Sequence, residues 1–262
     1  MVKIIVLVKD SVDLTELRFD PVSRSPQVEG AKHKIGDLDK RALEAAIRLR
    51  EKFDGKVITL SMGEKGTKTT LLEALAMGAD AAYIVNDRLK GVDACASSKV
   101  LAAALEKMGD FDLILCGEMS LDSLLSQIGP RLAELLGLPQ VTYAKELELI
   151  DAKLRAVRDL EDVDEIVEVE LPVVVSVVRE INEPRIPSLM NIMRARGKPT
   201  VEWDSAALGL SIEKIRAWSS IKIIEVKAPI VERKNIVIEG ESVEEVANRL
   251  AEAIITEGVL EG

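Results

Sequence analysis

Short apolar strands alternate with helical segments from residue 2 to residue 136, and this alternation constrains the fold more than any other feature. Two strands joined through a helix lie parallel, because so long a connection crosses over the sheet instead of turning back as a hairpin. We therefore expect an α/β fold with a doubly wound, mostly parallel sheet and right-handed crossovers. The expected strands are residues 2–8, 57–62, 81–85 and 113–116, and the expected helices are residues 37–52, 67–77, 94–108 and 128–136.

Polar residues mark where these helices begin. Asp37 or Asp39 can cap the first helix, Asp93 begins the third, and Ser126 can cap the fourth. A capped fourth helix would leave its first N–H groups pointing outward, where they could bind phosphate. An ordinary capped helix start explains the same residues equally well.

Two regions depart from the alternation. Residues 13–31 contain Pro21 and Gly30 and predict an irregular excursion with a small hairpin. From Tyr143 onward, short antiparallel strands are expected at 144–150, 153–159 and 166–170, and the acidic run 161–168 should be a solvated hairpin end.

The strand at Val173–Val178 is apolar on both faces, which predicts a central position in a sheet covered by helices. Pro184 and Pro187 then forbid regular structure, and residues 188–196 return to helical composition. This helix carries apolar residues on one face and basic residues behind them, namely Leu189, Ile192 and Met193 with Arg194, Arg196 and Lys198. The apolar face either packs onto the core or forms a protruding surface that fits partner proteins.

Beyond Pro199 the chain has little apolar sequence from which to build a core. Residues 205–218 and 243–255 are amphipathic helical stretches, and residues 221–226 between them are expected to be extended. We expect an α/β nucleotide-binding domain over residues 1–198 and a C-terminal arm over residues 199–262 that packs on another chain.

Composition excludes several classes of function. A net charge of -10 argues against nucleic acid as a partner. No apolar run approaches the roughly 20 residues that cross a bilayer, and the chain starts directly with a strand, so a cytoplasmic protein without membrane insertion is expected. With two cysteines and one histidine, a structural zinc site and nucleophilic catalysis are poorly supported, and the cysteines are expected to be small buried side chains.

The carboxyl ends of the first strands should line one crevice, because ligands of open α/β sheets bind outside the strand ends where the chain order reverses. These ends are Leu7 to Lys9, Met62 to Gly63, Val85 to Asn86 and Cys116 to Gly117. The connection Gly117–Pro130 is the richest in small and polar residues.

The run Asn182-Glu183-Pro184-Arg185, followed by Leu189, Asn191-Ile192-Met193 and Ala195, resembles the signature of the beta subunit of electron transfer flavoproteins. The likeness extends over essentially the whole chain. It implies a Rossmann-like fold of the adenine-nucleotide-binding type and a recognition loop, residues 183–198, that docks a dehydrogenase through Leu189, Ile192 and Met193. It also implies that the arm embraces an alpha subunit.

The same resemblance implies a nucleotide in the crevice, either AMP or a second FAD. Asp122, Gln127, Gly129 and Pro130 match the family's motif, whereas residues 123–125 depart from it, and Gly36-Asp37 stands where many members have Asn-Pro. Cys95 and Ser97 stand where bifurcating members have threonines beside the second flavin. The residues expected to bind cofactor are Leu7, Lys9, Gly36, Asp39, Met62, Gly63, Cys95, Ser97, Gly117, Asp122, Ser126, Gln127, Ile128 and Gly129.

As an implied function, the chain would pass electrons from a dehydrogenase through an FAD shared with the alpha subunit to a downstream acceptor, with or without electron bifurcation. Leu14 is the implied cover of the flavin ring. Such a subunit is an electron carrier, not an enzyme, and needs no catalytic acid or base. One alternative is a stand-alone adenine-nucleotide-binding regulator, which would need a Gly-rich phosphate loop before a final helix. Another is an ATP-using ligase, which would need a glycine-rich loop after the first strand. We find neither loop in the sequence.

Overall fold

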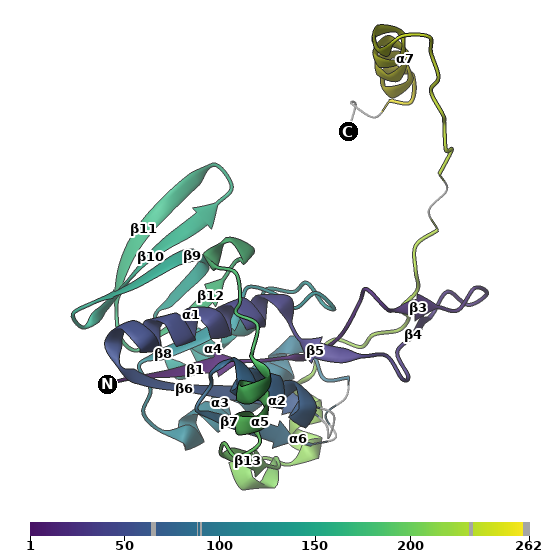
Figure 1. Ribbon diagram of the computed structural model, residues 1–262. Coiled ribbons are helices and arrows are strands. Elements are labelled where there is room, and N and C mark those ends of the chain that lie inside the picture. Colours follow the sequence, from purple (N-terminus) through teal and green to yellow (C-terminus); the bar gives the residue numbers. More distant parts are fainter. Residues whose placement is uncertain (64–66, 88, 90, 231–232, 259–262) are drawn as a thin grey trace. The chain divides into compact units, whose positions relative to one another are not determined.

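The computed structural model describes residues 1–63, 67–87, 89, 91–230 and 233–258 (Figure 1). The chain divides into two compact units, Met1–Val226 and Lys227–Gly262. None of the helices in the described ranges combines the length and the apolar character that a membrane span requires.

The first unit contains, within the described residues, a nine-stranded sheet in the order β11-β10-β9-β12-β8-β1-β6-β7-β13. From β9 to β13 neighbouring strands are parallel, and β9, β10 and β11 are antiparallel. The strands are β1 (Val2–Leu7), β6 (Gly55–Gly63), β7 (Ala81–Asn86), β8 (Leu113–Gly117), β9 (Gln140–Ile150), β10 (Lys153–Leu160), β11 (Val163–Glu170), β12 (Val173–Val177) and β13 (Thr200–Trp203).

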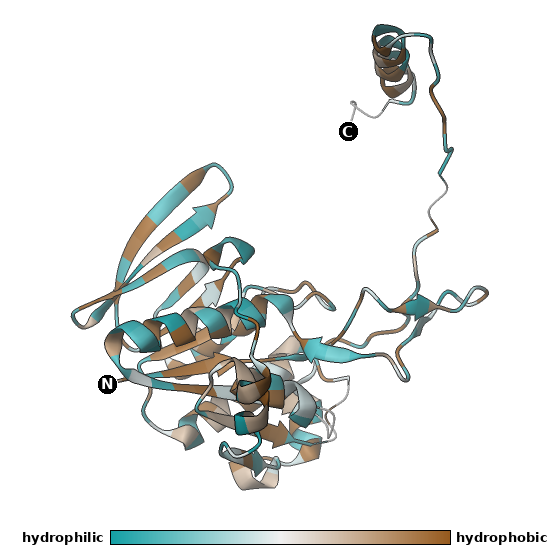
Figure 2. Ribbon diagram, in the orientation of Figure 1, coloured by the Kyte–Doolittle hydropathy of each residue, from teal (hydrophilic) through white to brown (hydrophobic). Residues whose placement is uncertain are grey.

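Each parallel strand sends alternate side chains to opposite faces of the sheet, which separates two cores. Ile4 and Val6 of β1 belong to one core, whereas Ile5 and Leu7 belong to the other. In Figure 2 the central strands are predominantly hydrophobic, as strands covered on both faces should be.

Helices cover both faces. Side chains of α1 (Asp37–Phe53) and α2 (Thr67–Met77) enter the first core, and side chains of α3 (Ala94–Met108) and α4 (Ile128–Leu136) enter the second. This arrangement confirms the doubly wound, mostly parallel sheet expected from the alternation of strands and helices.

The predicted excursion after β1 is confirmed. It consists of two small antiparallel pairs, β2 (Asp10–Val12) with β5 (His33–Ile35) and β3 (Arg18–Phe19) with β4 (Pro26–Gln27). The acidic run is also confirmed as an exposed hairpin end, because β10 and β11 turn back on each other around Glu161 and Asp162.

After β12 the chain crosses to the far edge of the sheet. It passes through η1 (Arg179–Ile181) and α5 (Leu189–Ala195), and β13 then pairs with β7. The sheet therefore extends past residue 198, where the sequence placed the end of the α/β domain, and the first compact unit runs to Val226.

The structure corrects one expectation in the segment that follows β13. Instead of one helix over 205–218 there are two, η2 (Ala206–Leu208) and α6 (Ile212–Trp218), because Gly209 adopts a left-handed conformation (φ 70°) that ends the first. Residues 221–226, which were expected to be extended, belong to neither a helix nor a strand.

The second unit contains α7 (Val243–Thr256). Ser242 accepts a hydrogen bond from the Glu245 N–H, and the Glu245 carboxylate accepts one from the Glu241 N–H. This reciprocal capping fixes the helix start. Val243, Leu250 and Ile255 of α7 are exposed apolar side chains.

Candidate functional site

The order of the strands reverses between β1 and β8. From β1 the chain proceeds through β6 and β7 in one direction, whereas the strands that follow β8 in the chain lie in the other direction, with β12 next to β8 and β9 next to β12. A doubly wound sheet has its ligand crevice at such a point. The last residues of β1 and β8 lead into Lys9 and Glu118, so these two connections border the crevice.

Asp39 joins the two sides of the crevice. Its carboxylate accepts hydrogen bonds from the backbone N–H of Lys9 (2.8 Å) and of Gly117 (3.0 Å). A side chain at position 117 would collide with this arrangement, because a Cβ there would lie 2.6 Å from Leu38 Cβ and 2.8 Å from Asp39 Oδ1. Glycine is therefore required at position 117 by the close approach of α1.

The capping prediction for α1 is wrong. Gly36 is the N-cap and has no side chain that could cap the helix. Asp37 and Asp39 lie in the first helical turn, past the N-cap position. Asp39 points toward the strand ends instead, and its charge still favours the helix start. Burial raises the pKa of Asp39 to about 6, against the lowering effect of the two N–H donors.

Lys9 and Asp122 form an ion pair on the rim of the crevice. Lys9 Nζ lies 2.7 Å from Asp122 Oδ1 and 3.2 Å from Ser120 Oγ, and the Ser120 and Ser123 hydroxyls are 2.7 Å apart. Burial alone would raise the pKa of Asp122, but the hydrogen bonds from Lys9 and Ser120 outweigh it and lower that pKa. Lys9, Gly36, Asp39, Gly117 and Asp122, all expected in the site, are thus brought together.

The prediction that Ser126 caps α4 is also wrong. Gln127 is the N-cap and forms no side-chain cap. Ser126 has a left-handed backbone (φ 51°), unlike the extended N-cap conformation that would aim its hydroxyl at the first turn. The N–H groups at the start of α4 therefore lack a capping side chain. Gly129 packs against the sheet, where a Cβ would lie 3.3 Å from Cys116 Sγ.

An open pocket of about 490 Å³ borders the start of α4. Glu118, Ser126, Pro130, Gln140, Thr142, Tyr143 and Arg158 line it. The Glu118 side chain is buried there and accepts a 2.6 Å hydrogen bond from the Ser176 hydroxyl. The sequence interpretation did not name Glu118, although its position directly after the end of β8 was a usable signal.

The other expected cofactor residues lie apart from this group. The side chains of Leu7 and Met62 pack in the core beneath α3 and α4, and Gly63 lies against Thr67. Cys95 and Ser97 are half-buried in the first turn of α3. Of the described hydrogen bonds, none joins these residues to Lys9, Asp39 or Asp122.

The start of α3 is held by its own chain. Asp93 caps the helix through the Ala96 N–H (2.9 Å) and also accepts hydrogen bonds from the N–H groups of Ser220 (2.7 Å) and Ile221 (3.1 Å). Burial would raise the pKa of Asp93, but these donors outweigh it and lower the pKa to about 2.

The two cysteines differ in their burial. Cys116 is buried, as expected, and burial raises the pKa of its thiol. Cys95 is only half-buried, so the expectation of a buried side chain is wrong for this residue.

The recognition loop presents its apolar side chains to solvent. Leu189 is 75% exposed, Met193 69% and Ile192 38%, and Ile186 and Met190, which the sequence interpretation did not single out, are exposed as well. Ala195 is the buried residue of α5, and Ser188 caps the helix by accepting a hydrogen bond from the Asn191 N–H (3.2 Å). Of the two alternatives, packing onto the core is excluded for Leu189 and Met193.

Comparison with known proteins gives a consistent result. The model of the electron transfer flavoprotein domain matches residues 27–208. The chain is 41% identical to the electron transfer flavoprotein subunit beta of Thermoanaerobacterium thermosaccharolyticum over 254 residues, which cover 94% of this chain and 95% of the relative.

Two further relatives cover nearly the whole chain. Subunit CarD of the caffeyl-CoA reductase-Etf complex of Acetobacterium woodii is 35% identical, with 95% of this chain and 96% of the relative covered. The electron transfer flavoprotein subunit beta of Bacillus subtilis is 36% identical, with 92% and 93% covered.

Proposed function

Since the chain belongs to the electron transfer flavoprotein family as a beta subunit, we propose that it forms a cytoplasmic heterodimer with an alpha subunit and receives electrons from a docked dehydrogenase. The family is one of electron carriers, so this subunit is not itself an enzyme. FAD shared with the alpha subunit supplies the redox chemistry when bound. This chain contributes the docking surface, part of the flavin environment and a nucleotide crevice.

The observation that carries the proposal is the exposed apolar tip of the recognition loop. Leu189, Met190 and Met193 lie on one short helix and face water in the isolated chain. Exposed apolar side chains gathered on one element mark a protein-binding surface. Methionine and leucine can adapt to more than one partner pocket.

The charge beside this tip indicates the chemistry of the partner. Arg194 and Arg196 are exposed at the end of α5, and this local positive charge contrasts with the net charge of -10 for the chain. We infer an apolar pocket on the dehydrogenase with acidic groups at its edge, because complementary charges speed association and select partners.

The crevice fits an adenine nucleotide in its donor set. The Lys9 ammonium group, the Ser120 and Ser123 hydroxyls and the uncapped start of α4 are the groups that would hold a phosphate. Three carboxylates would repel the phosphate, namely those of Asp39, Glu118 and Asp122. AMP and a second FAD both remain compatible with these residues, and a second FAD would make the protein electron-bifurcating.

The alpha subunit would contact several exposed apolar surfaces. We propose that the part of the arm beyond Val226, which contains α7, contributes to this interface and that Leu14, 41% exposed on the excursion after β1, covers one side of the flavin. The stand-alone regulator is not favoured, because the relatives that match nearly the full length are electron transfer flavoprotein subunits.

Co-expression with a candidate alpha subunit tests the heterodimer and the cofactors together. The purified complex should be yellow and contain one FAD per heterodimer if the crevice holds AMP, or two if it holds a second FAD. Acid release followed by chromatography distinguishes AMP from FAD. A colourless monomer that binds ATP tightly would contradict the proposal.

The docking role is tested by Leu189→Ala in the heterodimer. Electron delivery from the dehydrogenase should slow while the flavin content stays unchanged, because Leu189 is exposed and supports no core. Leu135→Ala is a matched control, since Leu135 is a similarly replaceable, 41% exposed leucine on α4. Loss of flavin in Leu189→Ala would show that the residue is structural.

A further inference from the structure

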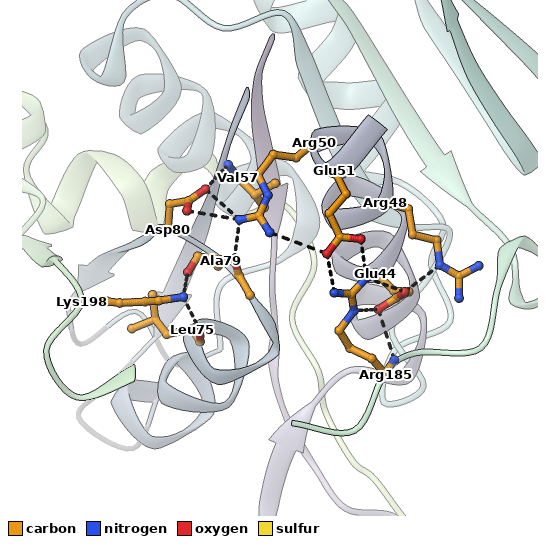
Figure 3. Close-up of polar contacts among 11 residues, drawn as sticks. Glu44, Arg48, Arg50, Glu51, Val57, Leu75, Ala79, Asp80, Arg185 and Lys198 are labelled. Carbon is orange, nitrogen blue, oxygen red and sulfur yellow. Dashed lines mark hydrogen bonds and ion pairs between the residues drawn. The ribbon is translucent and has the colours of Figure 1, made fainter. Parts of the chain in front are cut away.

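The recognition loop is attached to the body of the first unit at both of its ends. Its first residues contact α1, and Lys198 at its last residue contacts the end of α2 (Figure 3). Between these attachments lies the exposed apolar tip.

Arg185 is the centre of the first attachment. Its guanidinium donates to both carboxylate oxygens of Glu51, at 2.6 and 3.0 Å, and to both oxygens of Glu44, at 2.8 and 3.2 Å. The Arg185 backbone N–H donates to Glu44 as well, at 3.1 Å. A guanidinium bound to two carboxylates has almost no rotational freedom, so the direction of the chain at residue 185 is fixed.

Glu44 makes this attachment difficult to rearrange. Its side chain is only 2% exposed, and Arg48 Nε also donates to it at 2.6 Å. A buried carboxylate that loses a cationic partner remains in an apolar setting, which is strongly unfavourable. Release of Arg185 would therefore leave Glu44 with Arg48 alone.

Neighbouring contacts extend the attachment to the start of the loop. Arg41 Nη2 lies 3.1 Å from Glu183 Oε1, Arg48 donates to the Glu183 carbonyl at 3.0 Å, and Asn182 donates to the Arg41 carbonyl at 3.0 Å. Together with Arg185, the residues Asn182 and Glu183 thus bind this part of the chain to α1.

Lys198 forms the second attachment. Its ammonium group donates to the carbonyl oxygen of Leu75 in the last turn of α2 (2.9 Å) and to that of Ala79, two residues beyond the helix (2.6 Å). Ala195, three residues before Lys198, is buried in the core and so holds the end of α5 against the first unit.

We propose that Arg185 and Lys198 are positioning residues that hold the recognition loop in its docking conformation before a dehydrogenase arrives. A loop ordered in advance does not have to lose conformational freedom on binding, so docking is tighter for the same contacts. The proposal rests on the docking role proposed above and adds the residues that prepare the loop for it.

The experiment uses the heterodimer with its alpha subunit and compares Arg185→Gln, Arg185→Lys and Lys198→Met. Lys52→Gln is the matched control, because it removes an exposed α1 ion pair, with Glu148 at 3.0 Å, that does not involve the loop. Hydrogen exchange of the backbone N–H groups of residues 188–197 is measured without any dehydrogenase present. Steady-state electron transfer is then measured with a dehydrogenase that, after reduction by its own substrate, reduces the wild-type heterodimer.

We expect Arg185→Gln to speed exchange of the loop N–H groups about tenfold and to raise the KM for the dehydrogenase by a similar factor. The value of kcat and the flavin content should stay within about twofold of wild type, because the docked loop makes the same contacts. Arg185→Lys should show a smaller effect, since it keeps the positive charge but loses the paired hydrogen bonds to the carboxylates of Glu44 and Glu51. Lys198→Met releases the other end of the loop and should change the exchange of its N–H groups and the KM in the same direction. Lys52→Gln should change neither the exchange nor the KM.

Unchanged exchange in both Arg185→Gln and Lys198→Met would overturn the proposal without reference to any partner. Faster exchange with an unchanged KM would also overturn it, provided that Leu189→Ala raises the KM. If Leu189→Ala leaves the KM unchanged as well, the docking role itself fails while the ordering of the loop by Arg185 stands. Loss of flavin in Arg185→Gln would assign the residue to the general stability of the fold and overturn its role in the loop.

Discussion

The carboxylate of Asp39 holds together two strand ends that the sheet places on either side of its change of direction. It reaches Lys9 and Gly117 only because position 117 has no Cβ. One side chain from the first turn of α1 therefore sets the width of the crevice. Lys9, whose backbone it binds, then pairs through its ammonium group with Asp122.

The raised pKa of Asp39 predicts how the free energy of unfolding depends on pH. Burial raises this pKa from 3.8 to about 6, so between these values the folded protein holds a proton that the unfolded chain has released. The contribution of Asp39 to the free energy of unfolding is therefore complete below about pH 4 and is lost as the pH rises through about 6. The loss is at most about 3 kcal/mol, since one pKa unit corresponds to about 1.4 kcal/mol.

The measurement is the difference in unfolding free energy between wild type and Asp39→Asn, followed from pH 4 to pH 8 at one concentration of heterodimer. This difference cancels the other titrating groups. It should fall between pH 4 and pH 6 and stay level above pH 7. A difference that rises with pH would show that the folded protein favours the ionised carboxylate.

A second prediction concerns Glu118, the buried carboxylate beside the start of α4. Glu118→Gln keeps an acceptor for the Ser176 hydroxyl and removes a negative charge beside the start of α4, where we propose that a phosphate binds. We expect AMP to bind about tenfold more tightly, which corresponds to about 1.4 kcal/mol. Isothermal titration of nucleotide-stripped heterodimer measures this, and Glu134→Gln, farther along α4, is the control. If AMP bound Glu118→Gln as tightly as wild type or more weakly, its phosphate would not lie near Glu118.

Sequence patterns located the crevice residues that directly follow or precede predicted elements. Lys9 and Gly117 were found because the ends of parallel strands meet at one edge, whereas Asp122 was found through the resemblance to the family's motif. Tyr143 and Arg158 were missed, since they reach the pocket from an antiparallel ribbon whose register no local pattern reveals. Ser126 was assigned the wrong role because a left-handed backbone cannot be deduced from the residue type.

At the scale of elements, the end of α1 is fixed to the loop between α2 and β7 by Arg50 and Asp80 (Figure 3). Arg50 donates to both oxygens of Asp80 at 3.2 Å and to the Gly78 carbonyl at 2.8 Å, and Asp80 accepts the Val57 N–H at 2.8 Å. This group joins α1, the turn after α2 and β6. It lies close to the Lys198 attachment, because Lys198 donates to Ala79.

We expect Asp80→Ala to destabilise the first unit by about 2–3 kcal/mol, because the Val57 N–H and the Arg50 guanidinium would both lose their acceptor. Thermal unfolding of the heterodimer, followed by circular dichroism, measures the change. Asp110→Ala replaces an exposed aspartate as the control and should leave Tm within about 1 °C. An unchanged Tm for Asp80→Ala would mean that water replaces the carboxylate without loss.

The elements found most reliably from sequence were the buried strands and the helices between them, because both have strong apolar patterns. The strand β13 was not predicted. It has four residues and pairs only with β7, which is distant in the sequence, so its pairing is a property of the folded sheet. The division of 205–218 into two helices likewise depended on the conformation of Gly209.

At the scale of the whole molecule, the chain consists of a large α/β unit and a separate C-terminal unit with one helix in its described residues. The apolar side chains of Val243, Leu250 and Ile255 on α7 are exposed in this chain. They are the surface that we assign to the alpha subunit.

Truncation after Val226 tests this assignment. The shortened chain should fold, because both cores lie within residues 1–226, but it should bind the alpha subunit at least tenfold more weakly. Circular dichroism and analytical ultracentrifugation measure folding and association separately. A truncated chain that still forms the full heterodimer would remove the arm from the interface.

Arg185 and Lys198 secure the two ends of the recognition loop to different helices, and between them Ala195 alone among the described residues is buried in the core. Residues 186–197 should therefore be replaceable as one segment, provided that Ala195 is kept. Replacing them with a segment of equal length from a relative should redirect the protein to that relative's electron donor and leave its own flavin untouched.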